Sequence, residues 1–350
     1  MRAMARGKWE KNMSSLNHER LGILLANTGS PASPDPDDVR AYLGKFLSDP
    51  RIRPMNMVAW WAILHLFIFP KRGVSSGAKY AKIWTDEGSP FDIEHRKLAR
   101  LLEAQLSEEG FDAKVELGMS YGKPFIEDGL TALRKAGCTR IIVVPLYPQS
   151  AYSTTYAVDD QVKRSLKKLK WKIGYELVDT YSADATYLSA VAQTIAESDF
   201  NAEAGDRIIF NYHSVPMNDI DAGDTYREQV EATSAALAKK SNLTDDQWAI
   251  GYNCQFDKGR EWLHPFSREV LTQWAGESKQ GRVFMICPNF ATDCLETLYD
   301  IDYELEPFYL EQLKAAGHDE AGRSFEYIPC LNGTPAHANV LRHVLSPYLK

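Results

Sequence analysis

Three carboxylates spaced four residues apart form the most distinctive chemical pattern in this sequence. Glu296, Asp300 and Glu304 would share one face of a helix. Like charges at this spacing destabilise an isolated helix, so stability alone does not favour such a row. In a cleft, the row would suit proton transfer or the passage of a divalent cation. The spacing is also typical of a solvated acidic surface, and both interpretations remain open at this point.

One histidine occupies a position that suits a general base. His213 follows the apolar run 207–212 and precedes the segment 214–216, which ends in proline. An imidazole held at the tip of a buried strand can act as a rigid base, although a turn histidine bonded to backbone is the alternative. The acidic segment 293–304 follows another strand of the same half, so both groups can face one cleft. In contrast, His95 has the pattern of an exposed residue.

Short apolar runs alternate with helical patterns along the chain, which predicts parallel sheets covered by helices on both faces. Two groups of about four strands, split near residues 180–186, indicate two doubly wound lobes. Ligands of such sheets bind beyond the carboxyl ends of the strands or in clefts between lobes. The expected strands are 21–26, 115–119, 141–147, 172–178, 207–212, 248–252, 282–286 and 325–328. The expected helices are 36–47, 92–109, 124–136, 158–169, 184–197, 224–240, 263–275 and 336–349.

Composition excludes several classes of protein. The net charge of −7 over 350 residues argues against a nucleic-acid partner. Five dispersed cysteines favour reduced thiols in a cytoplasmic protein, and argue against a zinc ribbon or an iron–sulfur cluster. No phosphate-binding glycine motif is present. Residues 1–19 are polar and basic without an apolar core, so we expect a flexible N-terminal tail.

One apolar stretch, residues 55–69, stands apart from the strand pattern. It is too short to span a bilayer, and basic residues follow it directly after Pro70. The stretch is either a buried core helix or an exposed lip that receives an apolar ligand or contacts a membrane surface. The adjacent Trp60 and Trp61 favour the lip, so we expect peripheral membrane contact through residues 55–69.

Ordered sequence motifs over residues 20–349 resemble those of the ferrochelatase family, whose members insert ferrous iron into a porphyrin. The motifs include LANTGSP at 25–31, FLSDPR at 46–51, LYPQ at 146–149, YHSVP at 212–216, DCLETL at 293–298 and PCLNGTP at 329–335. The resemblance implies an α/β protein with two Rossmann-like doubly wound lobes, each around a roughly four-stranded parallel sheet. We expect residues 20–185 and 331–350 to form the first lobe, with a porphyrin lip at 51–75, and residues 186–330 to form the second.

The resemblance also implies roles for particular residues. His213 and Glu296 correspond to the catalytic pair, which also contacts the metal, and Asp300 and Glu304 to an acidic path for protons or metal. The porphyrin-binding residues expected from the resemblance are Thr28, Tyr121, Trp262, Trp60 and Trp61. Thr28 stands where the family has a larger side chain, which bears on porphyrin recognition more than on the reaction type.

The chemistry expected from the resemblance suits these residue types. A free-base porphyrin, protoporphyrin IX or coproporphyrin III, must lose two pyrrole protons as Fe²⁺ enters, and an adjacent base assists that loss. Imidazole and carboxylate can replace the water around the ion without trapping it. We therefore expect Fe²⁺ as a substrate, with no tightly bound cofactor and no iron–sulfur cluster. A chelatase for cobalt or nickel and a non-catalytic porphyrin or haem carrier are the alternatives, and the oligomeric state is left open.

Overall fold

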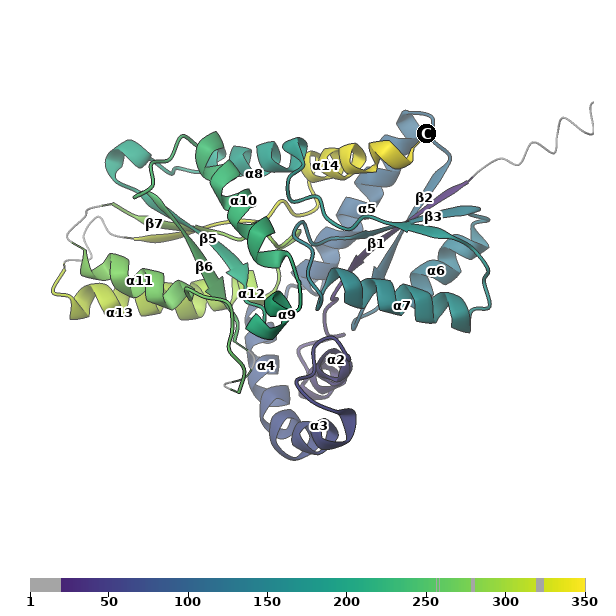
Figure 1. Ribbon diagram of the computed structural model, residues 1–350, viewed down its shortest axis with the longest axis horizontal. Helices are drawn as coiled ribbons and strands as arrows, with labels where there is room; N and C mark the ends of the chain where they lie inside the picture. Colours follow the sequence, from purple (N-terminus) through teal and green to yellow (C-terminus); the bar gives the residue numbers. More distant parts are fainter. Residues whose placement is uncertain (1–19, 256, 258, 278–280, 319–323, 350) are drawn as a thin grey trace, which may run out of the picture.

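Two parallel four-stranded sheets organise the protein, as the sequence predicted (Figure 1). The computed structural model describes residues 20–349 except 256, 258, 278–280 and 319–323, so the predicted tail 1–19 lies outside the described residues. The strand orders are β2-β1-β3-β4 and β6-β5-β7-β8. The strands are β1 (Leu21–Asn27), β2 (Ala113–Met119), β3 (Arg140–Pro145), β4 (Tyr175–Leu177), β5 (Arg207–His213), β6 (Trp248–Asn253), β7 (Val283–Ile286) and β8 (Phe325–Ile328).

Helices cover both faces of each sheet (Figure 1). In the first lobe, α5 (Pro90–Glu108) lies on one face, and α6 (Ile126–Lys135) and α7 (Thr155–Lys168) lie on the other. In the second lobe, α8 (Ala185–Glu197) and α10 (Tyr226–Lys240) lie opposite α11 (Ser267–Gly276) and α13 (Glu306–Ala315). The last helix, α14 (Pro335–Leu345), packs against α5 and α8 and so joins the two lobes. Buried side chains from both lobes belong to one continuous core.

The strand order places the ends of two central strands at the cleft. The two middle strands are β1 and β3 in the first sheet and β5 and β7 in the second. The first of each pair connects to the strand on one side of the sheet, and the second connects to the strand on the other side. The loops beyond such a reversal of strand order diverge and leave a crevice, where doubly wound sheets bind ligands. The segments after β1, β3, β5 and β7 are therefore the places where the fold itself predicts a binding site.

A helical extension projects from the first lobe below the sheets (Figure 1). It consists of α2 (Pro36–Ser48), α3 (Met57–Ile63), the π-helix η1 (Leu64–Ile68) and α4 (Phe69–Ile83). Trp60 and Leu64 turn inward and pack with Val39, Leu43 and other residues of α2 and α4. None of the helices among the described residues has the length and apolarity needed to cross a bilayer.

The acidic segment differs from the regular α-helix that the spacing predicted. A short helix, α12 (Leu295–Leu298), is followed by the π-helix η3 (Asp300–Leu305), which leads into α13. The apolar Ile301 and Leu305 pack into the core of the second lobe, while Asp300 and Glu304 are held on the other side by a lysine of α4. Short π-helical segments occur frequently at functional sites.

Candidate active site

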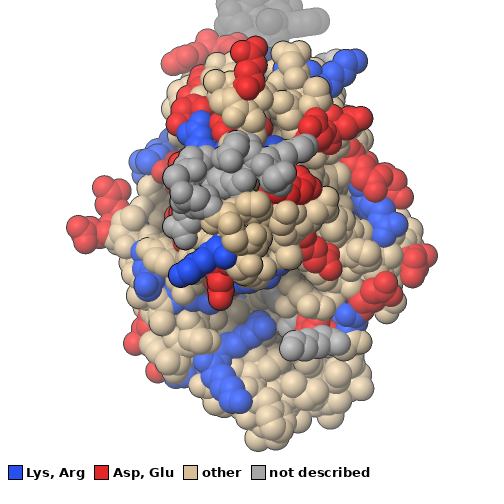
Figure 2. Space-filling model, turned by 90° about the vertical axis from the view of Figure 1, so that its left-hand side faces the viewer, with Lys and Arg blue, Asp and Glu red and all other residues tan. Residues whose placement is uncertain are grey.

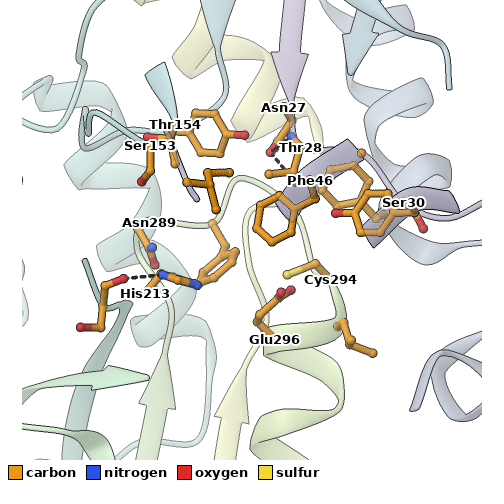
Figure 3. A pocket seen from close by; sticks show the side chains of 18 of the residues that line it. Asn27, Thr28, Ser30, Phe46, Ser153, Thr154, His213, Asn289, Cys294 and Glu296 are labelled. Atoms are coloured by element: carbon orange, nitrogen blue, oxygen red, sulfur yellow. Dashed lines mark hydrogen bonds between the residues drawn. The ribbon is translucent and has the colours of Figure 1, made fainter. Parts of the chain in front are cut away.

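A cleft between the two lobes brings together side chains from both sheets. With its open mouth it encloses about 1470 Å³ of empty space. Its walls include the segment after β1, the end of β5, the loop after β7 and the start of α12, the places that the strand order predicts. Figure 3 shows His213 and Glu296 projecting from the second lobe, opposite Thr28 and Phe46 of the first. The candidate site therefore lies between the lobes.

His213 is the last residue of β5 and is fixed by its own backbone neighbours. Its Nδ1 lies 2.6 Å from the carbonyl oxygen of Ser214, and its own carbonyl accepts a hydrogen bond of 2.9 Å from the Tyr226 hydroxyl. A carbonyl can only accept, so Nδ1 carries the proton and Nε2 bears the lone pair. Burial lowers the pKa of His213, although the nearby charge of Glu296 partly opposes the shift. The imidazole is consequently neutral at neutral pH and able to accept a proton.

Glu296 lies in the first turn of α12, across the cleft from His213 (Figure 3). The thiol of Cys294 sits beside it, and burial together with the charge of Glu296 raises the pKa of that thiol well above its usual value. Cys294 is therefore a neutral thiol rather than a thiolate at neutral pH. An acid in the first turn is also favoured by the positive end of the helix dipole.

Asp293 anchors the short helix that carries Glu296. Its buried carboxylate accepts hydrogen bonds from the Tyr327 hydroxyl at 2.6 Å, the Asn332 side-chain amide at 2.6 Å and the Thr297 hydroxyl at 3.0 Å. Bonds to an ionised acceptor are stronger than those between neutral groups. Asp293 thus serves as a structural acid that fixes α12 to the segment after β8.

The remaining acids of the row continue from the cleft toward the surface. Burial and the charge of Glu296 raise the pKa of Asp300 to about 6. Its Oδ2 lies 3.6 Å from the Cys254 thiol sulfur, and its Oδ1 lies 3.4 Å from the ammonium nitrogen of Lys79. Glu304 is more exposed and lies 2.6 Å from the same ammonium. Neither Asp300 nor Glu304 lines the cleft itself, so the row leads away from it.

The predicted porphyrin-binding residues divide into two groups. Thr28 and Trp262 line the cleft, and Tyr121 does not: it is buried behind Phe46, with the two ring centroids 5.1 Å apart. Trp60 is also buried, and its indole N–H donates to the carbonyl of Leu47. Trp61, by contrast, points outward with 54% of its surface exposed. The structure therefore brings only two of these five residues to the wall of the cleft.

Three arginines of the cleft were not among the site residues predicted from the sequence, although Arg51 belongs to the FLSDPR motif and Arg72 to the predicted lip. Arg51, Arg72 and Arg260 line the cleft and supply positive charge, and the Arg260 guanidinium lies 4.8 Å from the centre of the Trp262 ring. These arginines come from loops and a helix distant in sequence, so only the fold shows their proximity. Asn289, in contrast, directly follows β7 and could be found from the strand-end rule.

The expectation that His95 is exposed is wrong. The side chain is fully buried between the lobes, where its Nε2 lies 3.1 Å from the amide of Asn27 and its Nδ1 lies 3.1 Å from the hydroxyl of Thr292. His95 shares the buried apolar face of α5 with Phe91 and Leu98, so its helical spacing from these two residues could have indicated that it is buried. Asn27 and Thr292 both line the cleft, so His95 supports its wall from behind.

The imidazole and carboxylate groups of the cleft belong to separate elements of the second lobe. Among the residues that the structure describes, no three His, Cys, Asp or Glu side chains converge as a closed metal site. His213 and Glu296 offer one nitrogen and one carboxylate from separate elements that line the same cleft. Closed structural metal sites use four protein ligands.

Comparison with known proteins extends over nearly the whole chain. A family model described as Ferrochelatase matches residues 20–348. A ferrochelatase of Thioalkalivibrio sulfidiphilus is 39% identical over 324 residues, which cover 92% of this chain and 85% of the relative. A ferrochelatase of Haemophilus influenzae is 35% identical over 322 residues, covering 92% and 96%. Among solved structures, SirB from Bacillus subtilis with Fe³⁺ has a TM-score of 0.51 at 12% identity, covering 94% and 96%, a likeness of fold alone.

Proposed function

This chain belongs to the ferrochelatase family and inserts Fe²⁺ into a porphyrin in haem synthesis, and we propose that His213 and Glu296 perform the insertion together. The observation that carries this proposal is their common position: the tip of β5 and the first turn of α12 both present these side chains to one cleft. The pair combines a neutral base with a carboxylate on a rigid scaffold, which suits a reaction that exchanges protons for a metal ion.

In this proposal His213 removes the pyrrole protons. Insertion replaces two N–H protons of the free base by one Fe²⁺, so charge and atoms balance when two protons leave the cleft. The Nε2 lone pair of His213 accepts each proton in turn, because Nδ1 is engaged with the Ser214 carbonyl. The charge of Glu296 stabilises the imidazolium that forms, since an opposite charge nearby favours the charged form of the base.

Glu296 and the acidic row are proposed to deliver the metal ion. Fe²⁺ binds carboxylate oxygens and imidazole nitrogens, and ligands offered one at a time let the ion shed water in steps. Asp300 and Glu304 continue from Glu296 toward solvent and so provide further oxygens for the same ion. Burial and the charge of Glu296 raise the pKa of Asp300 to about 6, which suits the return of protons through this residue of the row.

The ring is proposed to lie between the polar wall near Thr28 and the indole of Trp262. Aromatic and apolar side chains line most of this space, as in other sites for flat ligands. The guanidinium groups of Arg51 and Arg260 pair with Asp160 and Asp257, respectively. Their remaining N–H donors are proposed to bind the propionate carboxylates that porphyrins carry, because guanidinium binds carboxylate well. Positive charge at one side of the cleft would fix the orientation of the ring.

The test is metal insertion by a His213→Ala variant under anaerobic conditions, followed by loss of the free-base spectrum. We expect turnover to fall by about 10²–10⁴-fold, the usual contribution of a general base, while porphyrin binding measured by fluorescence is retained. His343→Ala removes an imidazole on α14, which is 56% exposed, and is the matched control. Turnover of His213→Ala close to that of the control would refute the assignment.

A membrane-facing role is proposed for the lip, residues 51–75. Apolar side chains project outward along it, with Val58 84% exposed, Leu66 68% and Phe67 65%. In Figure 2 this lower end of the molecule is largely uncharged, and lysines and arginines lie directly above it. Apolar side chains beside basic groups suit an anionic lipid surface. Arg51, Ile52 and Arg72 of the lip also line the cleft, so the lip would place its mouth near the lipid.

A further inference from the structure

A single lysine of the first lobe neutralises the acidic row of the second. Lys79 lies on α4, the helix that follows the lip, and its ammonium nitrogen is 2.6 Å from a carboxylate oxygen of Glu304 and 3.4 Å from one of Asp300. The same nitrogen lies 4.9 Å from the centre of the Tyr299 ring, at the start of the π-helix. Lys79 therefore contacts two acids of the row, and the tyrosine that precedes the π-helix, from outside the element that carries them.

The charge state of this lysine is fixed by its partners. Burial disfavours the ammonium, but the hydrogen bond to Glu304 and the charge of Asp300 outweigh it and raise the pKa of Lys79 above its usual value. The second cation near the row, Arg268, lies 4.0 Å from Glu304 and is nearly half exposed. Lys79 is thus the closer and better shielded cation on the row.

An ammonium and a divalent metal ion use the same atoms of the row. Lysine donates hydrogen bonds to carboxylate oxygens, and hard or borderline cations bind those same oxygens directly. An ion at Asp300 and Glu304 must therefore displace the ammonium of Lys79. Without Lys79, less positive charge would neutralise the three carboxylates of the row. The row would then bind a metal ion more tightly and release it more slowly toward the cleft.

We propose that Lys79 is the counter-cation that an incoming metal ion displaces, and that it sets the affinity of the row for Fe²⁺. This inference rests on the proposed role of Asp300 and Glu304 as the metal path. Lys79 does not touch the reacting atoms, so it is a specificity-determining residue for metal delivery rather than a catalytic one. Its flexible side chain can swing aside and return, which keeps the row neutralised between turnovers.

The same helix supplies a matched control. Lys82 lies one turn further along α4 and its ammonium lies 4.6 Å from the centre of the Tyr303 ring. A Lys82→Met variant removes the same charge from the same helix and leaves the ammonium between Asp300 and Glu304 in place. Lys79→Arg keeps the charge at the row, and Lys79→Gln removes the charge but keeps a hydrogen-bond donor.

The experiment measures binding of Mn²⁺ alone to the full chain by electron paramagnetic resonance, together with KM values for Fe²⁺ and porphyrin. We expect Lys79→Met to bind Mn²⁺ about tenfold more tightly, or about 1.4 kcal/mol, and to lower the KM for Fe²⁺ while the KM for porphyrin stays constant. Lys82→Met and Lys79→Arg should resemble the wild type. Unchanged or weaker Mn²⁺ binding by both Lys79→Met and Lys79→Gln would overturn the inference. If Lys79→Met does not fold, Lys79→Gln alone provides the test.

Two acid variants separate this inference from the proposed path. If Asp300→Asn and Glu304→Gln leave Mn²⁺ binding and the KM for Fe²⁺ unchanged in the wild-type background, the path itself is wrong. If these variants weaken Mn²⁺ binding and raise the KM for Fe²⁺, while Lys79→Met behaves as the wild type, the path is supported and the proposed role of Lys79 is wrong. Combining Lys79→Met with Glu304→Gln should remove most of the tightening, because the lysine acts through that carboxylate.

Discussion

Acidification should destabilise the protein through the histidine buried between the lobes. Nδ1 of His95 lies 2.7 Å from the carbonyl of Phe91, so this nitrogen carries the proton, and Nε2 accepts from the side-chain amide of Asn27. The Asn27 amide is oriented by a bond from the Thr28 backbone N–H to its oxygen. A proton on Nε2 would therefore oppose the Asn27 amide donor in a buried site. Burial is the main cause that lowers the pKa of His95 to about 4.

The magnitude and sign follow from linkage. The ordinary pKa of 6.5 applies to the unfolded chain and about 4 to the native state. The unfolded chain consequently binds more protons between these values, so stability is complete above pH 6.5 and is lost as the pH falls toward 4. From pH 7 to pH 5, this one residue should remove about 2 kcal/mol from the free energy of unfolding. That is a large part of the stability of a typical protein.

Urea unfolding of the wild type and of a His95→Gln variant at pH 7 and pH 5 measures this effect. Glutamine retains hydrogen-bonding groups but does not titrate, so the free energy of unfolding should fall by about 2 kcal/mol less in the variant between the two pH values. Equal pH dependence in the wild type and His95→Gln would refute the reasoning.

Three further predictions concern the lip and the support of the site. Phe67→Asp should weaken co-sedimentation with anionic vesicles and leave metal insertion with a detergent-solubilised porphyrin unchanged, and equal sedimentation would contradict the membrane-facing role. Leu64→Ala should lower the free energy of unfolding by about 2–5 kcal/mol because Leu64 is fully buried, whereas Leu66→Ala on the exposed side should change it by less than about 0.5 kcal/mol. Asp293→Asn should lower both thermal stability and turnover, since it removes the charged acceptor that fixes the helix of Glu296; wild-type turnover would count against that role.

The fold, and the position of His213 and Glu296 at one cleft, could be predicted because their signals are local. Buried parallel strands give short apolar runs, and the end of such a run marks the edge of a sheet. His213 and Glu296 follow two neighbouring strands, so their meeting at one edge follows from the strand order. The family motifs point to the same two residues. All eight predicted strands are present.

Contacts between distant segments could not be predicted in the same way. Lys79 and Glu304 are 225 positions apart, and nothing around Lys79 marks it as the partner of an acid. The burial of His95 was missed for a different reason: histidine as a residue type indicates an exposed position, although this one shares the apolar face of α5 with Phe91 and Leu98. The π-helix η3 could not be predicted either, because acids spaced four residues apart are compatible with both an α-helix and a π-helix.

Chemical rescue tests the central claim most directly. Complexes of porphyrin with the wild type, His213→Ala and Glu296→Gln would be mixed anaerobically with excess Fe²⁺, and a single turnover followed by absorbance. Both variants should bind the ring and metallate it at least about 10²-fold more slowly, and added imidazole should restore part of the rate to His213→Ala alone. A His213→Ala rate within a few-fold of the wild type without imidazole, or equal rescue of Glu296→Gln, would contradict the account.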